Sequence, residues 1–261
     1  MYPDILKLGP LTIHSYGLFI SIAFTFGILL ATYRAKSRDI DVSMVLDMSI
    51  YAIVSAIVGS RIVYIIVNYK DYVNDPVRVF YIHQGGLVFY GGLIGVIITL
   101  SYYIRAHKLD FFKVADLLIP ALPLGHMFGR IGCFLNGCCY GACTTSAFGV
   151  VFPGLHSPVP RHPTQLYESL FCISSLFFLL FIEKYLKKSG YLFVTYIYLY
   201  SAWRFSIEFL RDDDRGAFLF GLSPSQNISL VGVVFATALL VYITKKTAGT
   251  AIAAQNIGEK K

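Results

Sequence analysis

Charged residues are scarce in this chain of 261 residues, where they make up only 14% of the sequence. Hydrophobic residues reach 56%, and the mean hydropathy is +0.63. Neither a long polar segment nor an internal repeat is visible, and this composition excludes an ordinary soluble globular domain. The segment before the first apolar run lacks a basic stretch and a small-residue cleavage site, so we expect no removable signal peptide. The composition indicates an integral membrane protein.

Seven apolar runs are long enough to cross about 30 Å of hydrocarbon as helices. They cover residues 15–33, 44–67, 86–104, 114–128, 166–183, 191–209 and 227–243. The fourth run is short and contains Asp116, Pro120, Pro123 and His126, so we expect it to be broken or re-entrant. The predicted fold class is all-α: a polytopic membrane protein of about seven transmembrane helices in a single domain, residues 1–261.

Basic residues gather after the odd-numbered predicted helices. These residues are Arg34, Lys36, Arg38, Arg105, Lys108, Lys113, Lys184, Lys187, Lys188, Lys245, Lys246, Lys260 and Lys261. The positive-inside rule therefore predicts an N-terminus outside and a C-terminus in the cytoplasm, with residues 245–261 as a short disordered tail. The net charge of +7 favours anionic membrane lipids as partners and gives no reason to expect nucleic acid.

Three arginines, Arg61, Arg130 and Arg204, fall inside or at the edge of apolar runs, where a charge costs a few kcal/mol. Each therefore needs a partner or a ligand. Arg61 lies near the outer end of its predicted helix, so snorkelling to the headgroups is an alternative to ligand binding. His126 precedes Arg130 by four residues and would share its helical face, although a lone histidine is more often structural.

The segment "SAWRFSIEFLRDDD" spaces Arg204, Glu208 and Arg211 so that they would share one face of a helix. Glu208 can then bridge both arginines, and the face keeps a net positive charge. An anion site and a static ion-pair network both fit this pattern.

Glycines are dense in "HQGGLVFYGGLIG", residues 83–95. Small residues such as Gly91 and Gly92 allow close packing of membrane helices. Irregular backbone that lines a polar cavity also suits doubled glycines. Close packing and a substrate crevice remain equal alternatives here.

Four of the five cysteines, Cys133, Cys138, Cys139 and Cys143, lie within eleven residues. Their spacing lacks the paired C-x-x-C pattern of most zinc sites, so we expect no metal. Disulfides or simple packing of small side chains both rank ahead of a metal. Because a direct bond between adjacent cysteines is strained, any bridge should join Cys133 or Cys143 to one of the middle two.

The stretch "GRIGCFLNGCCYG", residues 129–141, resembles the signature of the prolipoprotein diacylglyceryl transferase family. The matching positions are Gly129, Arg130, Gly132, Phe134, Leu135, Asn136 and Gly141. Further family-like blocks follow in order along nearly the whole chain: "LGPLTIHSYGL", "GGLVFYGGLIG", "ADLLIPALPLG", "RHPTQLYE", "WRFSIEFLRDDD" and "GLSPSQ". Three positions depart from the family pattern: Cys133 replaces Asn, Cys138 replaces Glu, and Tyr90 replaces His.

The resemblance implies transfer of a diacylglyceryl group from phosphatidylglycerol to the lipobox cysteine of preprolipoproteins, the first step of lipoprotein maturation. It implies a multi-pass enzyme of the bacterial cell (inner) membrane that needs no cofactor. The departures leave an alternative, a paralogue on the same fold that is a thiol-redox, metal-binding or lipid-binding protein. In the transferase, arginines would hold the phosphate because their planar fork binds its oxygens bidentately. We therefore interpret residues 129–141 as a phosphate-binding turn.

Site residues follow from the same resemblance and chemistry. The candidate catalytic residues are Arg130, Arg204, Tyr90, Glu208 and His126. The candidate substrate-binding residues are Tyr16, His14, Gly91, Gly92, Asp116, Asn136, Gly141, His162, Tyr167 and Arg211. The general base stays open among Tyr90, His126, His14 and His162, and the arginines alone can also lower the pKa of the substrate thiol.

Overall fold

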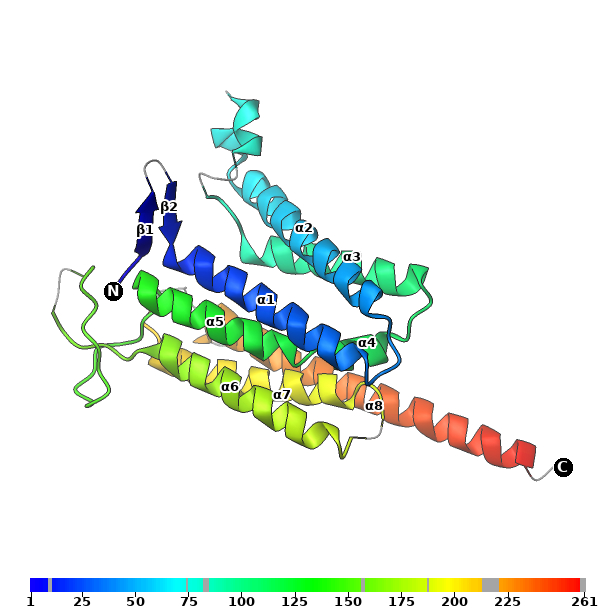
Figure 1. Ribbon diagram of the computed structural model, residues 1–261. Helices are drawn as coiled ribbons and strands as arrows, with labels where there is room; N and C mark the ends of the chain where they lie inside the picture. Colours follow the sequence, from blue (N-terminus) through cyan, green and yellow to red (C-terminus); the bar gives the residue numbers. More distant parts are fainter. Residues whose placement is uncertain are drawn as a thin grey trace. The chain divides into compact units, whose positions relative to one another are not determined.

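The computed structural model describes residues 1–8, 11–73, 75–81, 85–155, 158–186, 188–212 and 221–258, and the side chains of residues 7, 8, 11 and 247–258 are not included. The described residues are mostly helical (Figure 1). The α-helices are α1 (Ser15–Ala35), α2 (Val42–Val67), α3 (Phe89–Ala106), α4 (Phe111–Leu118), α5 (Ala121–Asn136), α6 (Thr164–Glu183), α7 (Tyr191–Ile207) and α8 (Pro224–Gly258). Short 3-10 helices are η1 (Tyr69–Asp71), η2 (Pro76–Phe80) and η4 (Glu208–Leu210).

Six helical segments of the described chain have the length and apolar composition to cross a membrane. They are α1, α2, α3, the α4–α5 segment Phe111–Asn136, α6, and α8 as far as Lys246. α7 is only slightly shorter, with 17 residues. The prediction of an all-α polytopic membrane protein is therefore confirmed.

The predicted fourth helix is broken, as expected. α4 ends at Leu118 and α5 begins at Ala121. Pro120 lies at the break, where it cannot donate a backbone hydrogen bond and where it disfavours helical geometry at the preceding residue. The interpretation of residues 129–141 as a turn was wrong for its first part, because residues 129–136 form the last two turns of α5.

Three further features differ from the sequence predictions. β1 (Asp4–Leu8) and β2 (Leu11–His14) form an antiparallel hairpin that was not predicted. Arg211 does not continue the face of Arg204 and Glu208, because α7 gives way to η4 and Arg211 is extended, with φ −89° and ψ 149°. The predicted disordered tail from Lys245 is helical as far as Gly258, since α8 continues to that residue.

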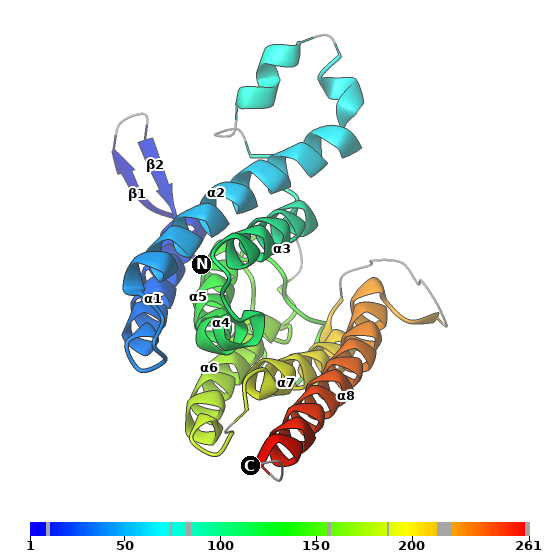
Figure 2. The same ribbon diagram turned by 90° about the vertical axis from the view of Figure 1, so that its right-hand side faces the viewer.

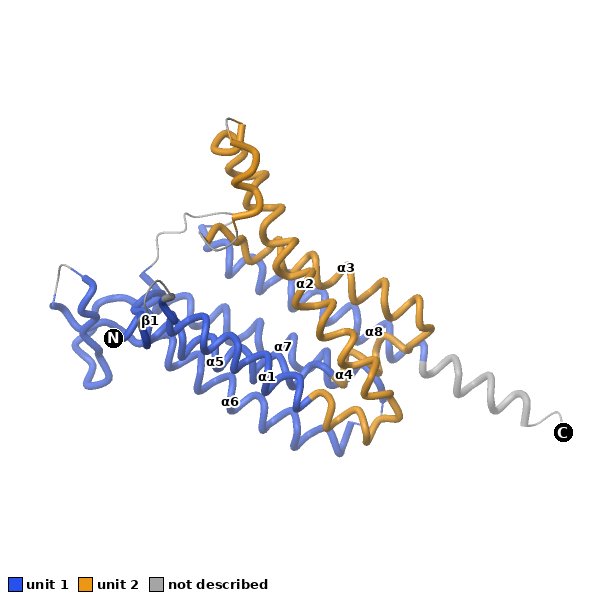
Figure 3. The backbone as a smooth tube through the Cα atoms, turned by 45° about the horizontal axis from the view of Figure 1, so that its top comes forward, with its two compact units in different colours: residues 1–30, 118–261 blue, residues 31–117 orange. Residues whose placement is uncertain are grey.

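The chain divides into two compact units, residues 1–30 with 118–261 and residues 31–117 (Figure 3). Within the first unit α5 lies along α6 and α7 along α8, as Figures 1 and 2 show. Its buried core includes Ile119, Leu179, Leu192 and Tyr196. The expectation of a single domain over residues 1–261 stays a prediction.

In the second unit, the glycines of α3 pack directly on α2. A Cβ atom on Gly91 would collide with the carbonyl oxygen of Gly59, and one on Gly92 would lie 2.5 Å from Ser60 Oγ. Both glycines are buried. Of the two alternatives left open above, their immediate surroundings fit close helix packing.

Arg61 and Arg34 are buried in the second unit, at 7% and 5% exposure. Arg61 donates to the carbonyl oxygens of Arg78 at 2.7 Å, Val79 at 2.9 Å and Gly85 at 2.8 Å. Backbone acceptors therefore satisfy its guanidinium within the second unit. Arg34 similarly donates to carbonyl oxygens of α4.

Candidate active site

Arg130 on α5 is the centre of a charged cluster in the first unit. Its Nε lies 2.5 Å from Glu168 Oε2 on α6 and donates to His126 Nε2 at 3.1 Å. The Glu168 side chain is 1% exposed and that of Arg130 is 16% exposed. Both contacts are made by Nε, and among the described residues Nη1 and Nη2 have no hydrogen-bond partner. Arg130 is thus fixed from one side and keeps the two-pronged end of its fork available.

Arg204 near the end of α7 belongs to a second cluster. Its Nη1 lies 2.7 Å from Glu208 Oε2, and its Nη2 donates to Ser225 Oγ at 2.8 Å. Ser223 Oγ donates to the other oxygen of Glu208 at 2.8 Å. The predicted pairing of Arg204 with Glu208 is present, and both side chains are nearly buried, at 11% and 8% exposure. The hydroxyl groups that orient the pair come from Ser223, just before α8, and from Ser225 in its first turn.

Arg130 and Arg204 share neighbours in the first unit. Both interact electrostatically with His126 and with Tyr200 on α7. The His126 ring lies 5.5 Å from that of Tyr200, measured between centroids. The site therefore presents two guanidinium groups around a partly buried imidazole.

The end of α5 turns sharply into the cysteine-rich loop. Gly137 adopts the left-handed conformation, with φ 76°, and caps the helix. The amide of Cys138 then donates to the carbonyl of Cys133 at 3.2 Å. Two fully buried residues at the start of α6 hold the loop, because Gln165 Nε2 donates to the Cys138 carbonyl at 2.6 Å and Thr164 Oγ1 to the Cys139 carbonyl at 2.9 Å.

Three of the cysteines are close together. The Sγ atoms of Cys133, Cys138 and Cys139 all lie within 4.8 Å of one another. All five cysteines of the chain are free thiols in the structure, so of the two alternatives, disulfides or packing, it contains no disulfide. Hydrogen bonds with Cys133 and Cys138, followed by the positive charges of Arg130 and Arg211, lower the pKa of the Cys139 thiol.

Gly141 ties the cysteine loop to the rest of the site through its backbone. Its amide donates to the His162 carbonyl at 2.8 Å, and it forms a β-bridge with Arg211. A Cβ atom here would collide with the Leu210 carbonyl and would lie 2.8 Å from Thr164 Cγ2. Glycine is required at this position because the chains approach too closely for a side chain.

Arg161 stabilises the same loop from outside. Its Nη1 donates to Asp212 Oδ2 at 2.5 Å, and its guanidinium stacks over the Tyr140 ring at 5.1 Å. The hydrogen bond to Asp212 raises the pKa of Arg161. Because Arg161 is already paired with Asp212, we expect it to stabilise the loop and not to bind an anion.

The other predicted site residues fall into two groups. Tyr16 in the first turn of α1 interacts electrostatically with the three clustered cysteines and with Arg130, and the Asn136 side chain acts on the Cys138 thiol. Both therefore lie at the site. By contrast, His14 is a hairpin residue 66% exposed that pairs with Asp4 at 2.8 Å.

His162 and Tyr167 contact each other at 3.3 Å at the start of α6. Tyr90, Gly91, Gly92 and Asp116 belong to the second unit, where Tyr90 is 53% exposed and Asp116 is buried in α4. Their roles stay predictions.

Sequence reasoning missed three contributors to this site. Glu168, Ser223 and Gln165 are each polar residues at or near a helix start, with partners distant in the sequence. Glu168 stood in the quoted block "RHPTQLYE", next to an apolar run that makes a carboxylate costly. That cost was the signal that this residue needed a cationic partner.

Comparison with known proteins finds matches over nearly the whole chain. A family model described as "Prolipoprotein diacylglyceryl transferase" matches residues 3–242. A phosphatidylglycerol–prolipoprotein diacylglyceryl transferase of Clostridium tetani is 37% identical over 237 residues, covering 90% of this chain and 94% of the relative. Similar proteins from Clostridium perfringens, named transferase 2, and Clostridium botulinum strain Langeland are each 36% identical, over 242 and 252 residues. These alignments cover 92% and 94% of this chain, and 93% and 98% of the relatives.

Proposed function

We propose that this chain, which belongs to the prolipoprotein diacylglyceryl transferase family, transfers the diacylglyceryl group of phosphatidylglycerol to a cysteine thiol of prolipoproteins. In this reaction the acceptor sulfur attacks the glyceryl carbon. The bond between that carbon and the phosphate oxygen breaks, and glycerol phosphate leaves. The enzyme must bind an anionic headgroup and stabilise the charge that develops on the departing phosphate.

This proposal rests on which nitrogen atoms of Arg130 have partners in the structure. Glu168 and His126 engage only its Nε. The two Nη groups can therefore bind two oxygens of one phosphate, which is the geometry in which arginine recognises phosphate most strongly. In a site of low dielectric, such preorganised donors contribute most to stabilising developing charge.

Arg204 supplies the second positive charge in this proposal. Glu208 and Ser225 hold it in one orientation, so its charge acts on the phosphate without reorganisation. Glu208 is a positioning residue here, since its contacts are with Arg204 and Ser223. His126, beside both arginines, remains a candidate for proton transfer, as does Tyr90.

The finer assignments also belong to the proposal. We infer that the acceptor cysteine lies in a lipobox, that Tyr16, Asn136, Gly141 and Arg211 contact substrate, and that the helices hold the acyl chains in a bacterial cell membrane. The distribution of Lys and Arg supports an N-terminus outside the cell and a cytoplasmic C-terminus. Reporter fusions at each end, of which only the C-terminal one should be active in the cytoplasm, test this orientation.

Complementation tests the proposed function. The chain is expressed in a bacterium depleted of its own diacylglyceryl transferase, and the intact mass of a reporter lipoprotein is measured. We expect the mass of one diacylglyceryl group to be added with the wild-type chain and not with Arg130→Ala. If the protein is verified in the membrane and no such mass appears, the proposal is overturned.

The thiol-redox alternative is separable from the transferase by the same assay. A redox protein on this fold would tolerate Arg204→Ala, because the charge of Arg204 is not among those that act on the Cys139 thiol. The transferase would lose activity with Arg204→Ala.

A further inference from the structure

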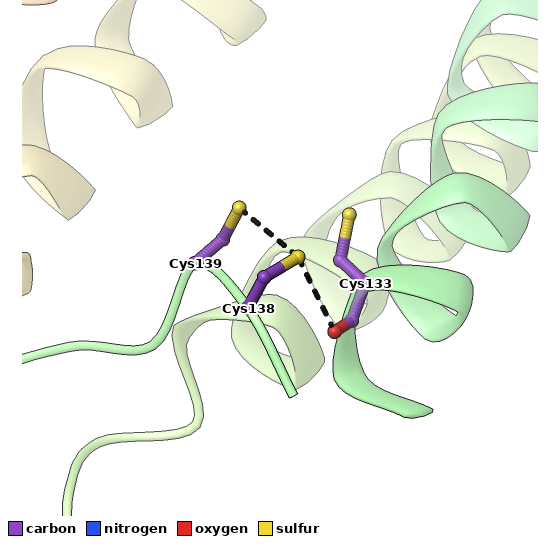
Figure 4. A group of neighbouring side chains, drawn as sticks. All are labelled: Cys133, Cys138 and Cys139. Carbon is purple, nitrogen blue, oxygen red and sulfur yellow. Dashed lines mark hydrogen bonds between the residues drawn. The ribbon is translucent and has the colours of Figure 1, made fainter. Parts of the chain in front are cut away.

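Three thiols converge at the end of α5 in the first unit. Cys138 Sγ and Cys139 Sγ are 3.5 Å apart, and Cys133 Sγ lies within 4.8 Å of both. Figure 4 shows the three side chains with their sulfur atoms on the same side of the backbone. The proposed transfer mechanism assigns no role to these sulfur atoms.

The backbone at Cys139 explains how two adjacent cysteines can face one centre. Successive side chains of an extended chain point to opposite sides. Cys139 instead has φ 66°, a left-handed conformation that is uncommon for any residue other than glycine. Such a conformation persists only where the surrounding structure stabilises it. Thr164 and Gln165 stabilise it by binding the carbonyls on either side.

The spacing of the sulfur atoms suits a metal ion. Four tetrahedral ligands at about 2.3 Å from zinc are about 3.8 Å apart from one another. The observed separations of 3.5 Å and up to 4.8 Å bracket this value. Side-chain rotations that shift the sulfur atoms by up to about 1 Å therefore complete three zinc–sulfur bonds. The sequence did not predict a metal because it lacks paired C-x-x-C spacing, but the helix end and the strained turn bring the same ligands together.

The charges around the three cysteines also fit a bound zinc ion. Three thiolates around one divalent cation leave one net negative charge, which needs compensation in a membrane protein. Arg130 and Arg211 both interact electrostatically with this cluster. Arg130 precedes Cys133 by three residues on α5, so both lie on neighbouring positions of the helix surface.

Within the described chain, the cluster offers three ligands from cysteine and no fourth from His, Asp or Glu. Cys143 is exposed, and its backbone pairs with Arg161 away from the group. Structural zinc sites are closed by four protein ligands, whereas catalytic sites use three and keep one position open. The ligand count is therefore that of an open site.

We propose that Cys133, Cys138 and Cys139 bind one zinc ion whose open position takes the thiol of the acceptor cysteine. This inference rests on the proposed function for its substrate. A thiol that coordinates zinc loses its proton, and the nucleophile is then the thiolate. The metal thereby performs the task for which the sequence left the general base unassigned.

The acceptor thiol binds zinc and releases one proton to water. Its sulfur then uses an electron pair to form the carbon–sulfur bond, while the carbon–oxygen bond of the lipid breaks and its electron pair stays on the phosphate. The leaving glycerol phosphate carries the added negative charge next to Arg130, and the thioether product, a weaker ligand, dissociates from zinc.

The first test measures metal. The full chain is purified in detergent from cells grown with zinc, and its zinc content is determined by elemental mass spectrometry. We expect about one zinc ion per chain in the wild type and in the control variants Cys143→Ser and Cys172→Ser. We expect most of it to be lost in Cys133→Ser, Cys138→Ser and Cys139→Ser. Wild-type protein that holds no zinc, or variants that retain it, would overturn the site.

Cobalt provides a readout that does not depend on activity. Replacing zinc with Co²⁺ should give two absorption features. One is sulfur-to-cobalt charge transfer in the near ultraviolet, and the other is the set of visible bands that tetrahedral cobalt shows. Adding a cysteine-containing acceptor peptide should change the visible bands, and the same peptide with serine in place of cysteine should not. Identical spectra with both peptides would overturn the open position.

The last test separates the inference from the proposed function. Zinc is removed with a chelator, diacylglyceryl transfer to the peptide is measured, and zinc alone is restored. Loss of transfer that zinc reverses supports the inference. Transfer by protein that neither holds zinc nor responds to the chelator overturns the metal and leaves the proposed function intact. Zinc-loaded protein that transfers nothing overturns the proposed function and leaves the metal site intact.

Discussion

Replacing Arg130 with lysine isolates the contribution of its guanidinium fork. A lysine ammonium reaches one bond beyond the position of Arg130 Nε, so it can still pair with Glu168, whose carboxylate lies 2.5 Å from that Nε. Arg130→Lys therefore keeps the positive charge and the ion pair. It removes both Nη groups, which are the ones with no partner among the described residues.

The size of the effect follows from this geometry. Removing a preorganised donor from a site of developing negative charge lowers kcat by about 100- to 1000-fold, or about 3–4 kcal/mol. The phosphate gains a negative charge as the carbon–oxygen bond breaks, so the lost contacts are stronger in the transition state than in the ground state. We therefore expect the loss in kcat, with a smaller change in KM for phosphatidylglycerol.

The assay measures initial rates of peptide modification in detergent with matched amounts of protein. Arg105→Lys is the matched control, because Arg105 is exposed on α3 and has no role in the site. The control should retain wild-type rates. Arg130→Lys with a kcat close to that of the control would refute the role of the Nη groups.

Three further predictions address the surroundings of the site. Glu168→Gln should lower the free energy of unfolding by about 3–5 kcal/mol in denaturant titration, because it leaves the Arg130 charge uncompensated; an unchanged midpoint would contradict the pairing. Gly91→Ala should destabilise the fold by about 1–3 kcal/mol because its Cβ would collide with a backbone carbonyl of α2, whereas Gly17→Ala, with no atom near its added Cβ, should melt like the wild type. Tyr90→Phe should retain transfer activity if zinc ionises the acceptor thiol, and a loss as large as that of Arg130→Lys would show that the Tyr90 hydroxyl is required.

Most of the helical fold could be predicted because its signals are local. Long apolar runs located the helices, and Pro120 located the break between α4 and α5. The hairpin of residues 4–14 was missed because its strands are short and carry little alternation. The end of α7 was placed too late, since an apolar run does not reveal where a helix tightens into η4.

The site was only partly predictable because its partners are distant in the sequence. The pair of Arg204 with Glu208 and that of Arg130 with His126 follow from helical spacing and are both present. The contacts of Arg130 with α6 and of the Arg204–Glu208 pair with Ser223 and Ser225 depend on tertiary packing. Similarly, the hydrogen-bond acceptors of Arg61 are carbonyl oxygens of η2 and of Gly85, which no local pattern indicated.

The clustering of the cysteines could not be predicted from their spacing either. Their spacing argued against a metal, yet the cap at Gly137 and the left-handed turn at Cys139 bring three sulfur atoms together. A motif that reads ligand spacing along the sequence does not detect ligands that an unusual turn brings together.

The central claim, that this chain transfers a diacylglyceryl group, is tested most directly with a labelled lipid. Purified protein is incubated with phosphatidylglycerol that carries deuterium in its diacylglyceryl part and with a peptide that contains a lipobox cysteine. We predict that the peptide gains the mass of the deuterated diacylglyceryl group on its cysteine and that an equal amount of glycerol phosphate is released. A peptide of unchanged mass, beside folded membrane protein and intact lipid, would contradict the account.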